Sequence, residues 1–166
     1  MIARTFRDLR AWQAAYAFKI RVYELIESGS LSKDEYFQKQ LREAAASATS
    51  QISEGFGRFD PADFGRFVKM ARASLLECQN HLEDAVDRHY ITDADRQEYD
   101  KLVQQALREI GGLLDYLQSP EAKRNAERIR QKREERRARR NLERRNLERR
   151  NLERRNREPG TPNDEP

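Results

Sequence analysis

Four segments of this sequence repeat apolar side chains every three to four residues, and this period restricts the body of the chain to helices. The segments cover about residues 8–27, 33–54, 61–88 and 92–118. No segment sustains the strict alternation that is typical of a strand. Because the connectors are short, each helix has to return beside its predecessor. The pattern therefore predicts an all-α protein, an antiparallel up-down-up-down four-helix bundle.

Each segment has one face that we expect to pack in the bundle. The stripe of the second segment consists mostly of small side chains, which permits close helix approach, and the third segment has the strongest period. The faces are Leu9, Trp12, Tyr16, Tyr23 and Ile26 in the first segment; Phe37, Leu41, Ala44, Ala45, Ala48 and Ile52 in the second; Phe64, Phe67, Val68, Ala71, Leu75, Cys78, Leu82 and Val86 in the third; and Tyr99, Leu102, Val103, Ala106, Ile110, Leu113, Leu114 and Leu117 in the fourth.

The charge of the 166 residues is unevenly distributed along the chain. Residues 120–166 contain 17 Lys and Arg against 10 Asp and Glu, a net charge of +7, whereas residues 1–119 have a net charge of −3. A slightly acidic body thus precedes a strongly basic tail. We expect a bundle domain at 1–118, a basic projecting helix at 119–140, and a low-complexity repeat with a disordered end at 141–166.

The tail contains good helix formers but few apolar residues. Ser119 and Pro120 can cap and start a fifth helix, and NLERR then occurs three times in tandem from residue 141. A five-residue period turns about 140° per repeat on a helix, so the repeat leucines cannot form a heptad seam. Each repeat Glu follows its arginines, the weaker orientation for ion pairs, and we expect only partial helicity there. The final EPGTPNDEP is predicted to be disordered.

Cysteine content and hydropathy restrict the cellular setting. Cys78 is the only cysteine, which excludes an internal disulfide and fits a reducing cytosol. No apolar run approaches the roughly 18 residues of a membrane helix, and the N-terminal MIARTFRDLR is charged where a signal peptide would be apolar. We expect a soluble, cytoplasmic protein that does not interact with membranes.

The stretch SEGFGRFDPADFGRF, residues 53–67, has two possible interpretations, a phosphate cradle or a corner between helices. As a corner, Gly55 or Gly57 would end one helix in the left-handed conformation, and Asp60, Pro61 and Asp63 would begin the next. As a cradle, its free N–H groups would have to receive an anion beside two aspartates that repel it. The corner is therefore the preferred interpretation.

An enzyme is not expected from this sequence. A di-metal bundle needs two Glu-x-x-His pairs, whereas the chain has two histidines and neither has Glu three residues before it. Cys78 and His81 lie one helical turn apart, but no second pair completes a metal site. No nucleophile and base can be paired from the sequence context. We expect no catalytic residues, no metal and no cofactor.

Arginine clusters are the features that indicate a ligand, because the arginine fork suits phosphate groups and base edges. On a helical tail, one slowly drifting face could follow phosphates, and on the third segment a basic surface could continue from the corner. The alternatives are a solvated, functionally neutral tail and ion pairs with Asp63, Glu77 or a neighbouring subunit. The candidate nucleic-acid-binding residues are Lys123, Arg130, Arg133, Arg137, Arg140 and Arg144 in the tail and Arg58, Arg66, Lys69 and Arg72 in the body.

Three motifs carry a resemblance to a known family over about residues 6–118. They are an Asp-Leu-x-x-Trp-Gln start, a Glu-Gly-x-Gly-Arg corner and an Ala-Arg-x-Ser-Leu-x-Glu stretch. With these motifs the chain resembles the bacterial 23S rRNA-intervening sequence proteins, from which it departs at Gln51, Ser53 and Ala73. The matching residues are Asp8, Leu9, Trp12 and Gln13; Glu54, Gly55, Gly57 and Arg58; and Ala71, Arg72, Ser74, Leu75 and Glu77.

The resemblance implies a four-helix bundle that assembles into a homopentamer and has no known enzymatic activity. It also implies a relation to accessory bundles of diversity-generating retroelements, which bind nucleic acid and a reverse transcriptase. From the basic tail and this resemblance together we expect a homo-oligomeric accessory protein that binds nucleic acid, with RNA preferred. The alternative is a scaffold that docks a reverse transcriptase or another protein partner.

Overall fold

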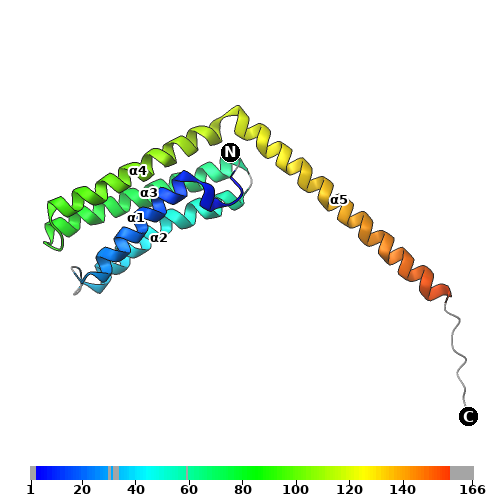
Figure 1. The fold of residues 1–166 in the computed structure, drawn as a ribbon, viewed down its shortest axis with the longest axis horizontal. Helices are drawn as coiled ribbons and strands as arrows, with labels where there is room; N and C mark the ends of the chain where they lie inside the picture. The colour runs from blue at the N-terminus through cyan, green and yellow to red at the C-terminus, as the bar shows by residue number, and fades with distance from the viewer. Residues whose placement is uncertain (1–2, 30, 32–33, 59, 158–166) are drawn as a thin grey trace, which may run out of the picture. The chain divides into compact units, whose positions relative to one another are not determined.

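The structure is a computed structural model that describes residues 3–29, 31, 34–58 and 60–157, and within these ranges it contains helices and no strand. The all-α class expected from the sequence is confirmed. A 3-10 turn, η1, covers Phe6–Asp8 and precedes α1 at Arg10–Glu27, α2 at Glu35–Gly57, α3 at Pro61–Asp87, α4 at Asp93–Gln118 and α5 at Pro120–Arg157 (Figure 1).

The chain divides into two compact units, one up to Arg124 and one from Asn125 onward. In the first unit α1 packs against α2 and α4, and α3 packs against α2 and α4, so the four helices lie side by side in chain order (Figure 1). This arrangement is an up-down helical bundle, as the short connectors require. The second unit consists, in its described part, of the remainder of α5.

Polar caps determine where three of the bundle helices begin. Asp34 accepts a hydrogen bond from the backbone N–H of Phe37 at the start of α2, and Asp60 caps α3 with Pro61 in the first helical position. Thr92 and Asp95 form a reciprocal capping box at the start of α4. Such caps satisfy backbone donors that have no partner within the helix. The start predicted for α3, with Asp60 and Pro61, is confirmed.

The core runs along the bundle between all four helices, and its side chains in α2, α3 and α4 are largely those that the periodicity predicts. All six residues of the second stripe are buried. Of the third and fourth faces, Val86, Leu102, Leu113 and Leu114 are only partly buried and pack against the core. The largest side chains with under 2% exposure are Phe18, Leu31, Leu41, Ile52, Leu75, Leu82 and Ile110.

The face predicted for α1 lies mostly at the edge of the core. Of the five predicted residues only Ile26 is buried; Leu9, Trp12 and Tyr23 are partly buried and pack against the core, and Tyr16 is 39% exposed. The residues that enter the core are Ala11, Ala15, Phe18, Val22, Leu25 and Ile26. Small alanines let α1 approach its neighbours closely, while the aromatic rings with their polar tips cover the flank of the helix. Trp12 and Tyr16 stack there, with their ring centroids 4.8 Å apart.

The corner between α2 and α3 also differs from its predicted form. Neither Gly55 nor Gly57 is left-handed; among the described residues, positive φ angles occur only at Gly29 and His89. Helix α2 instead continues through Gly57. Gly55 serves helix packing, because a Cβ added to it would lie 2.5 Å from Cδ2 of Phe64 and 2.8 Å from Cβ of Phe67. A close approach, and not a chain reversal, explains this glycine.

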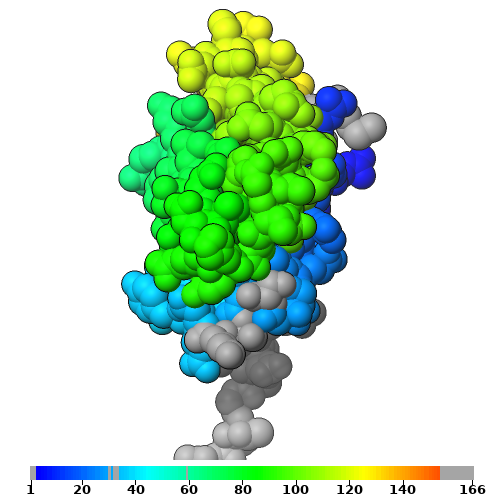
Figure 2. Space-filling view, turned by 90° about the vertical axis from the view of Figure 1, so that its left-hand side faces the viewer, coloured from blue at the N-terminus to red at the C-terminus, as the bar shows by residue number. Residues whose placement is uncertain are grey.

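At the opposite end of the bundle, the α3–α4 turn is fastened to the start of α2. The Asp34 carboxylate accepts hydrogen bonds from Arg88 Nη1 at 3.2 Å and from the Tyr90 hydroxyl at 3.1 Å. The Tyr90 and Phe37 rings meet edge to face. Figure 2 looks onto this end, where the turn (green) lies beside the ends of α1 and α2 (blue). The contacts join three helices at one polar residue.

Helix α5 is continuous through all three NLERR repeats as far as Arg157, so the partial helicity predicted for this segment is wrong. Four arginines bind the glutamate four residues later, which supports the helix despite the weaker orientation. Leu142, Leu147 and Leu152 are each at least 60% exposed, as their spacing predicts. The predicted disorder of EPGTPNDEP concerns residues 158–166, outside the described residues. None of the helices described combines the length and apolar character needed to span a membrane.

Candidate nucleic-acid interface

The candidate cations of the bundle lie at the α2–α3 corner and along the exposed side of α3. Arg58 caps the end of α2, forms an ion pair with Glu54 and lies over the Phe67 ring, 4.9 Å from its centroid. Arg66 lies 5.2 Å from the same centroid and 3.8 Å from the Asp63 carboxylate. Both arginines thus already have an acid and an aromatic ring as partners, which weakens their attraction for a phosphate group.

The start of α3 does not form a phosphate cradle. Asp60 Oδ1 accepts hydrogen bonds from the backbone N–H groups of Ala62 and Asp63, both at 2.9 Å. The donors that an anion would need are therefore occupied by a carboxylate of the chain itself. The interpretation of this stretch as a corner agrees with the structure, and the cradle is contradicted.

Lys69 and Arg72 are the two remaining bundle candidates. Both are exposed on α3, and no described acidic side chain lies within ion-pair distance of either. Arg72 does not bind Glu77, which instead approaches His81 Nε2 at 4.0 Å. Since Arg58 and Arg66 are paired, Lys69 and Arg72 are the two candidates here without an ion pair to a described residue. A pair of surface cations gives only a weak phosphate contact in water.

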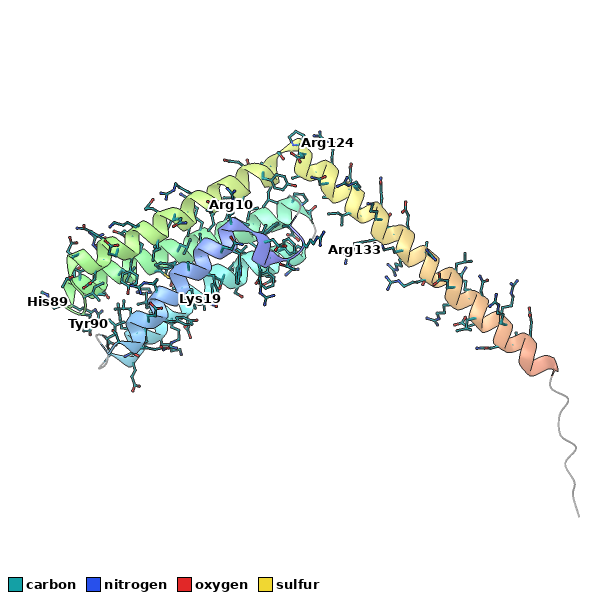
Figure 3. The ribbon with its side chains drawn as sticks, in the orientation of Figure 1. Arg10, Lys19, His89, Tyr90, Arg124 and Arg133 are labelled. Carbon is teal, nitrogen blue, oxygen red and sulfur yellow. The ribbon has the colours of Figure 1, made fainter. Side chains whose placement is uncertain are left out.

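The tail candidates all lie on α5. Some of them form ion pairs with glutamates of the same helix, and others do not. Arg130 donates from Nε to Glu134 at 3.1 Å, and Arg144 donates from Nε to Glu148 at 2.8 Å. Lys123, Arg137 and Arg140 are exposed, and no ion pair joins them to a described residue. Arg133 is exposed on α5 as well (Figure 3). The predicted face is thus partly neutralised by the helix's own glutamates.

Sequence reasoning did not include other cations of α5 that are equally exposed. Arg128, Lys132 and Arg136 form no ion pair with any described residue, and they are spaced four residues apart. The sequence shows this spacing, and residues four apart lie side by side on a helix. It does not show which arginines of α5 bind glutamates, and this pairing is what distinguishes the three cations from their neighbours.

A second group of cations lies against the aromatic side chains of α1. Lys19 Nζ is 4.5 Å from the ring centroid of Tyr16, and Arg42 of α2 lies over Tyr23 at 5.4 Å. Lys19 projects from α1 in Figure 3. These cations are partners of the chain's own rings, and the contact of Arg42 with Tyr23 joins α2 to α1.

The thiol and imidazole groups do not form a reactive pair. Cys78 is fully buried in the core, and burial raises the pKa of its thiol to about 12, which keeps the thiol protonated at neutral pH. His81 contacts the Phe37 ring edge to face, and its Nε2 is buried without a hydrogen-bond partner. In the described part of the chain, no three His, Cys, Asp or Glu side chains are placed to hold a metal ion.

Comparison with known proteins adds one finding. The model of a protein family described as 23S rRNA-intervening sequence protein matches residues 7–112. The match covers well over half of the 166 residues, from η1 through most of α4, and it does not reach α5. A search of curated proteins finds no match.

Proposed function

Because the chain belongs to the 23S rRNA-intervening sequence protein family, we propose that it is a non-catalytic, homo-oligomeric bundle that binds RNA through its additional basic helix. The three sequence motifs indicated the same family, and the match confirms it. The match stops at residue 112, so α5 is an addition to the part that the family shares. This division suggests separate roles, assembly for the bundle and attraction of a polyanion for α5.

The observation that carries the proposal is the set of exposed cations on α5 that have no acidic partner. Arg128, Lys132, Arg136, Arg137 and Arg140 belong to it, and none is joined by an ion pair to a described residue. Cations that neutralise phosphates release condensed counterions, which supplies a sequence-independent binding free energy. Arginine planes also stack on unpaired bases, which favours single-stranded RNA.

Oligomerisation would strengthen this binding without any further contact. We expect the bundle to assemble into a homo-oligomer, a pentamer by the family resemblance, and every subunit would then contribute one α5. When one helix of the assembly has bound a long RNA, the other helices experience a raised effective concentration of that RNA. Several weakly binding helices then bind tightly together, provided that the geometry lets them bind at the same time. A long RNA should therefore bind far more tightly than an RNA that reaches only one helix.

A scaffold that docks a protein partner is the alternative function, and the exposed aliphatic side chains of the bundle do not favour it. Met70 and Leu76 are large apolar side chains of α3 that are each 43% exposed. They lie about 120° apart around the helix axis, so they do not form one patch. Isolated exposed apolar residues are normal on a soluble protein. If RNA binding fails, docking of a protein partner is the alternative function.

The test is a salt series with the full chain. Fluorescence anisotropy should measure affinities for two single-stranded RNAs of unrelated sequence and for DNA of one of those sequences, between about 0.05 and 0.5 M salt. We expect equal affinities for the two RNAs, weaker DNA binding, and a steep linear fall of log K with log salt. Binding that resists salt, or no binding at the lowest salt, contradicts the proposal.

A further inference from the structure

One side of α5 carries a row of like charges that the helix does not neutralise. We call this row the basic ridge. Its members follow one another at four-residue intervals, so that each lies about 6 Å further along the axis and about 40° further around it. All four side chains are exposed, and in the described part of α5 none takes part in an ion pair. The ridge consists of Arg128, Lys132, Arg136 and Arg140.

Arg136 lies at the centre of the ridge. Its helical neighbours three and four residues away are all basic, namely Lys132, Arg133, Arg139 and Arg140. Like charges at this spacing repel one another and weaken a helix. No acidic residue occupies any of the four positions that could relieve this repulsion within the helix. A bound polyanion would remove the unfavourable interaction and add favourable ones.

The glutamates of the same helix bind other arginines. Glu134 accepts from Arg130, and the two other well-formed pairs join Arg139 to Glu143 and Arg144 to Glu148. Arg149 approaches Glu153 at 3.9 Å. We call Arg130, Arg139, Arg144 and Arg149 the paired arginines. Glu135 stands three residues after Lys132 and forms no ion pair within the described chain. Each paired arginine therefore has a counter-charge beside it, whereas the ridge has none on the described helix.

We propose that the basic ridge is the strip of α5 that contacts the phosphate backbone of RNA, with Arg136 at its centre. This inference rests on the proposed RNA-binding function and specifies which side of the helix performs it. It also differs from the face predicted from the sequence, which contains the paired residues Arg130 and Arg144 and shares only Arg140 with the ridge. Three of the four contact residues are thus newly assigned.

Two quadruple variants of the full chain test the ridge at equal net charge. The ridge variant replaces its four members by Gln, and the matched control replaces the four paired arginines by Gln. Each variant removes four positive charges from α5, and Gln has a helix propensity similar to that of Arg. Circular dichroism of both variants measures whether α5 remains helical, because the control also removes the ion pairs of the paired arginines. Affinity for one labelled single-stranded RNA is then measured as a function of salt.

For the ridge variant we expect the slope of log K against log salt to fall by about 3, which is four contacts at about 0.7 each. The corresponding loss of affinity at 0.15 M salt is on the order of 100-fold. The paired-arginine variant should lose at least ten times less. Arg136→Gln alone should lower the slope more than Arg144→Gln.

The possible failures are distinguishable. If the unaltered chain binds RNA and both quadruple variants lose affinity equally, net charge alone drives binding and the ridge is refuted, while the proposed function stands. If the paired-arginine variant loses more, the contact strip lies on the other face and the ridge is again refuted. If the unaltered chain does not bind RNA at low salt, the proposed function and the ridge fail together.

Discussion

At Gly55 the absence of a side chain determines how closely α2 and α3 pack. A Cβ there would lie 2.8 Å from Cβ of Phe67, an atom that cannot rotate away from the α3 backbone. Gly65 is the natural comparison, since it lies within α3 and a Cβ added to it would meet nothing within 4 Å. The two glycines therefore have opposite expected responses to the same substitution.

Gly55→Ala should lower the free energy of unfolding by about 1–2 kcal/mol, because overpacking outweighs the gain in helix propensity. Gly65→Ala should raise it by about 0.5–1 kcal/mol, since alanine is a better helix former and has room. Urea denaturation of the two variants measures both values. Equal effects of the two substitutions would show that the close approach at Gly55 does not exist.

Asp34 is the residue that joins the α3–α4 turn to the start of α2. The pKa of the Asp34 carboxyl lies below its ordinary value of 3.8, mainly because the carboxylate accepts a hydrogen bond from the backbone N–H of Phe37. A hydrogen bond from Tyr90 and the nearby charge of Arg88 also lower this pKa, whereas burial raises it. A carboxyl whose pKa is lowered by folding stabilises the protein fully above pH 3.8, and this contribution is lost as the pH falls through the folded-state pKa.

Asp34→Asn keeps a capping side chain but removes the charge that faces Arg88. We expect the variant to be less stable than the unaltered chain at pH 7, with the difference shrinking as the pH falls below 3.8. Thermal denaturation between pH 7 and pH 2.5 measures this. Asp115→Asn is the control, because Asp115 is exposed and forms no ion pair with a described residue. A difference that stays constant down to pH 2.5 would refute the assigned role of Asp34.

At the scale of single helices, the sequence predicted α2, α3 and α4 well because their stripes consist of aliphatic and small residues with one obvious buried side. It placed the face of α1 at the edge of the core, because aromatic residues form an equally regular stripe there. Trp12, Tyr16 and Tyr23 can cover a helix flank with one side in water, so their period does not distinguish the core from its edge. In the structure Ala11 and Ala15, and not the aromatic residues, occupy the buried side of α1.

The free cations of α5 could not be predicted for a different reason. Each NLERR glutamate has arginines both three and four residues before it, and the sequence does not tell which of them it binds. In the structure Glu143 binds Arg139 and Glu148 binds Arg144, four residues before in both cases. This choice leaves Arg140 and Arg145 without an acidic partner among the described residues. Of these two arginines, Arg140 belongs to the basic ridge.

The same pairs predict how α5 responds to loss of its glutamates. Replacing Glu134, Glu143 and Glu148 by Gln should lower the helical content of the full chain, because three ion pairs that offset arginine repulsion disappear. The control replaces Glu121, Glu127 and Glu135, which form no ion pair with a described residue. Circular dichroism at low salt should show a smaller loss for the control. Equal losses would mean that the individual pairs do not support the helix.

At the scale of the whole molecule, the two units differ in what they can contribute. The bundle has a continuous apolar core and belongs to the part that the family shares, whereas the described part of α5 beyond Asn125 contains almost no buried side chain. A helix with so little apolar surface cannot contribute much to a core. Its charges are thus available to a partner, and each subunit of an assembly would offer one such helix.

Sedimentation velocity with a labelled single-stranded RNA tests this division most directly, using the full chain and a chain that ends at Arg124, where the first compact unit ends. Both proteins should sediment as the same oligomer. The RNA should sediment with the full chain at low salt and be released from it at high salt. With the shortened chain, the RNA should remain free at both salt concentrations. RNA that travels equally with the shortened chain, or that stays free beside the full chain at low salt, would contradict this division between the bundle and α5.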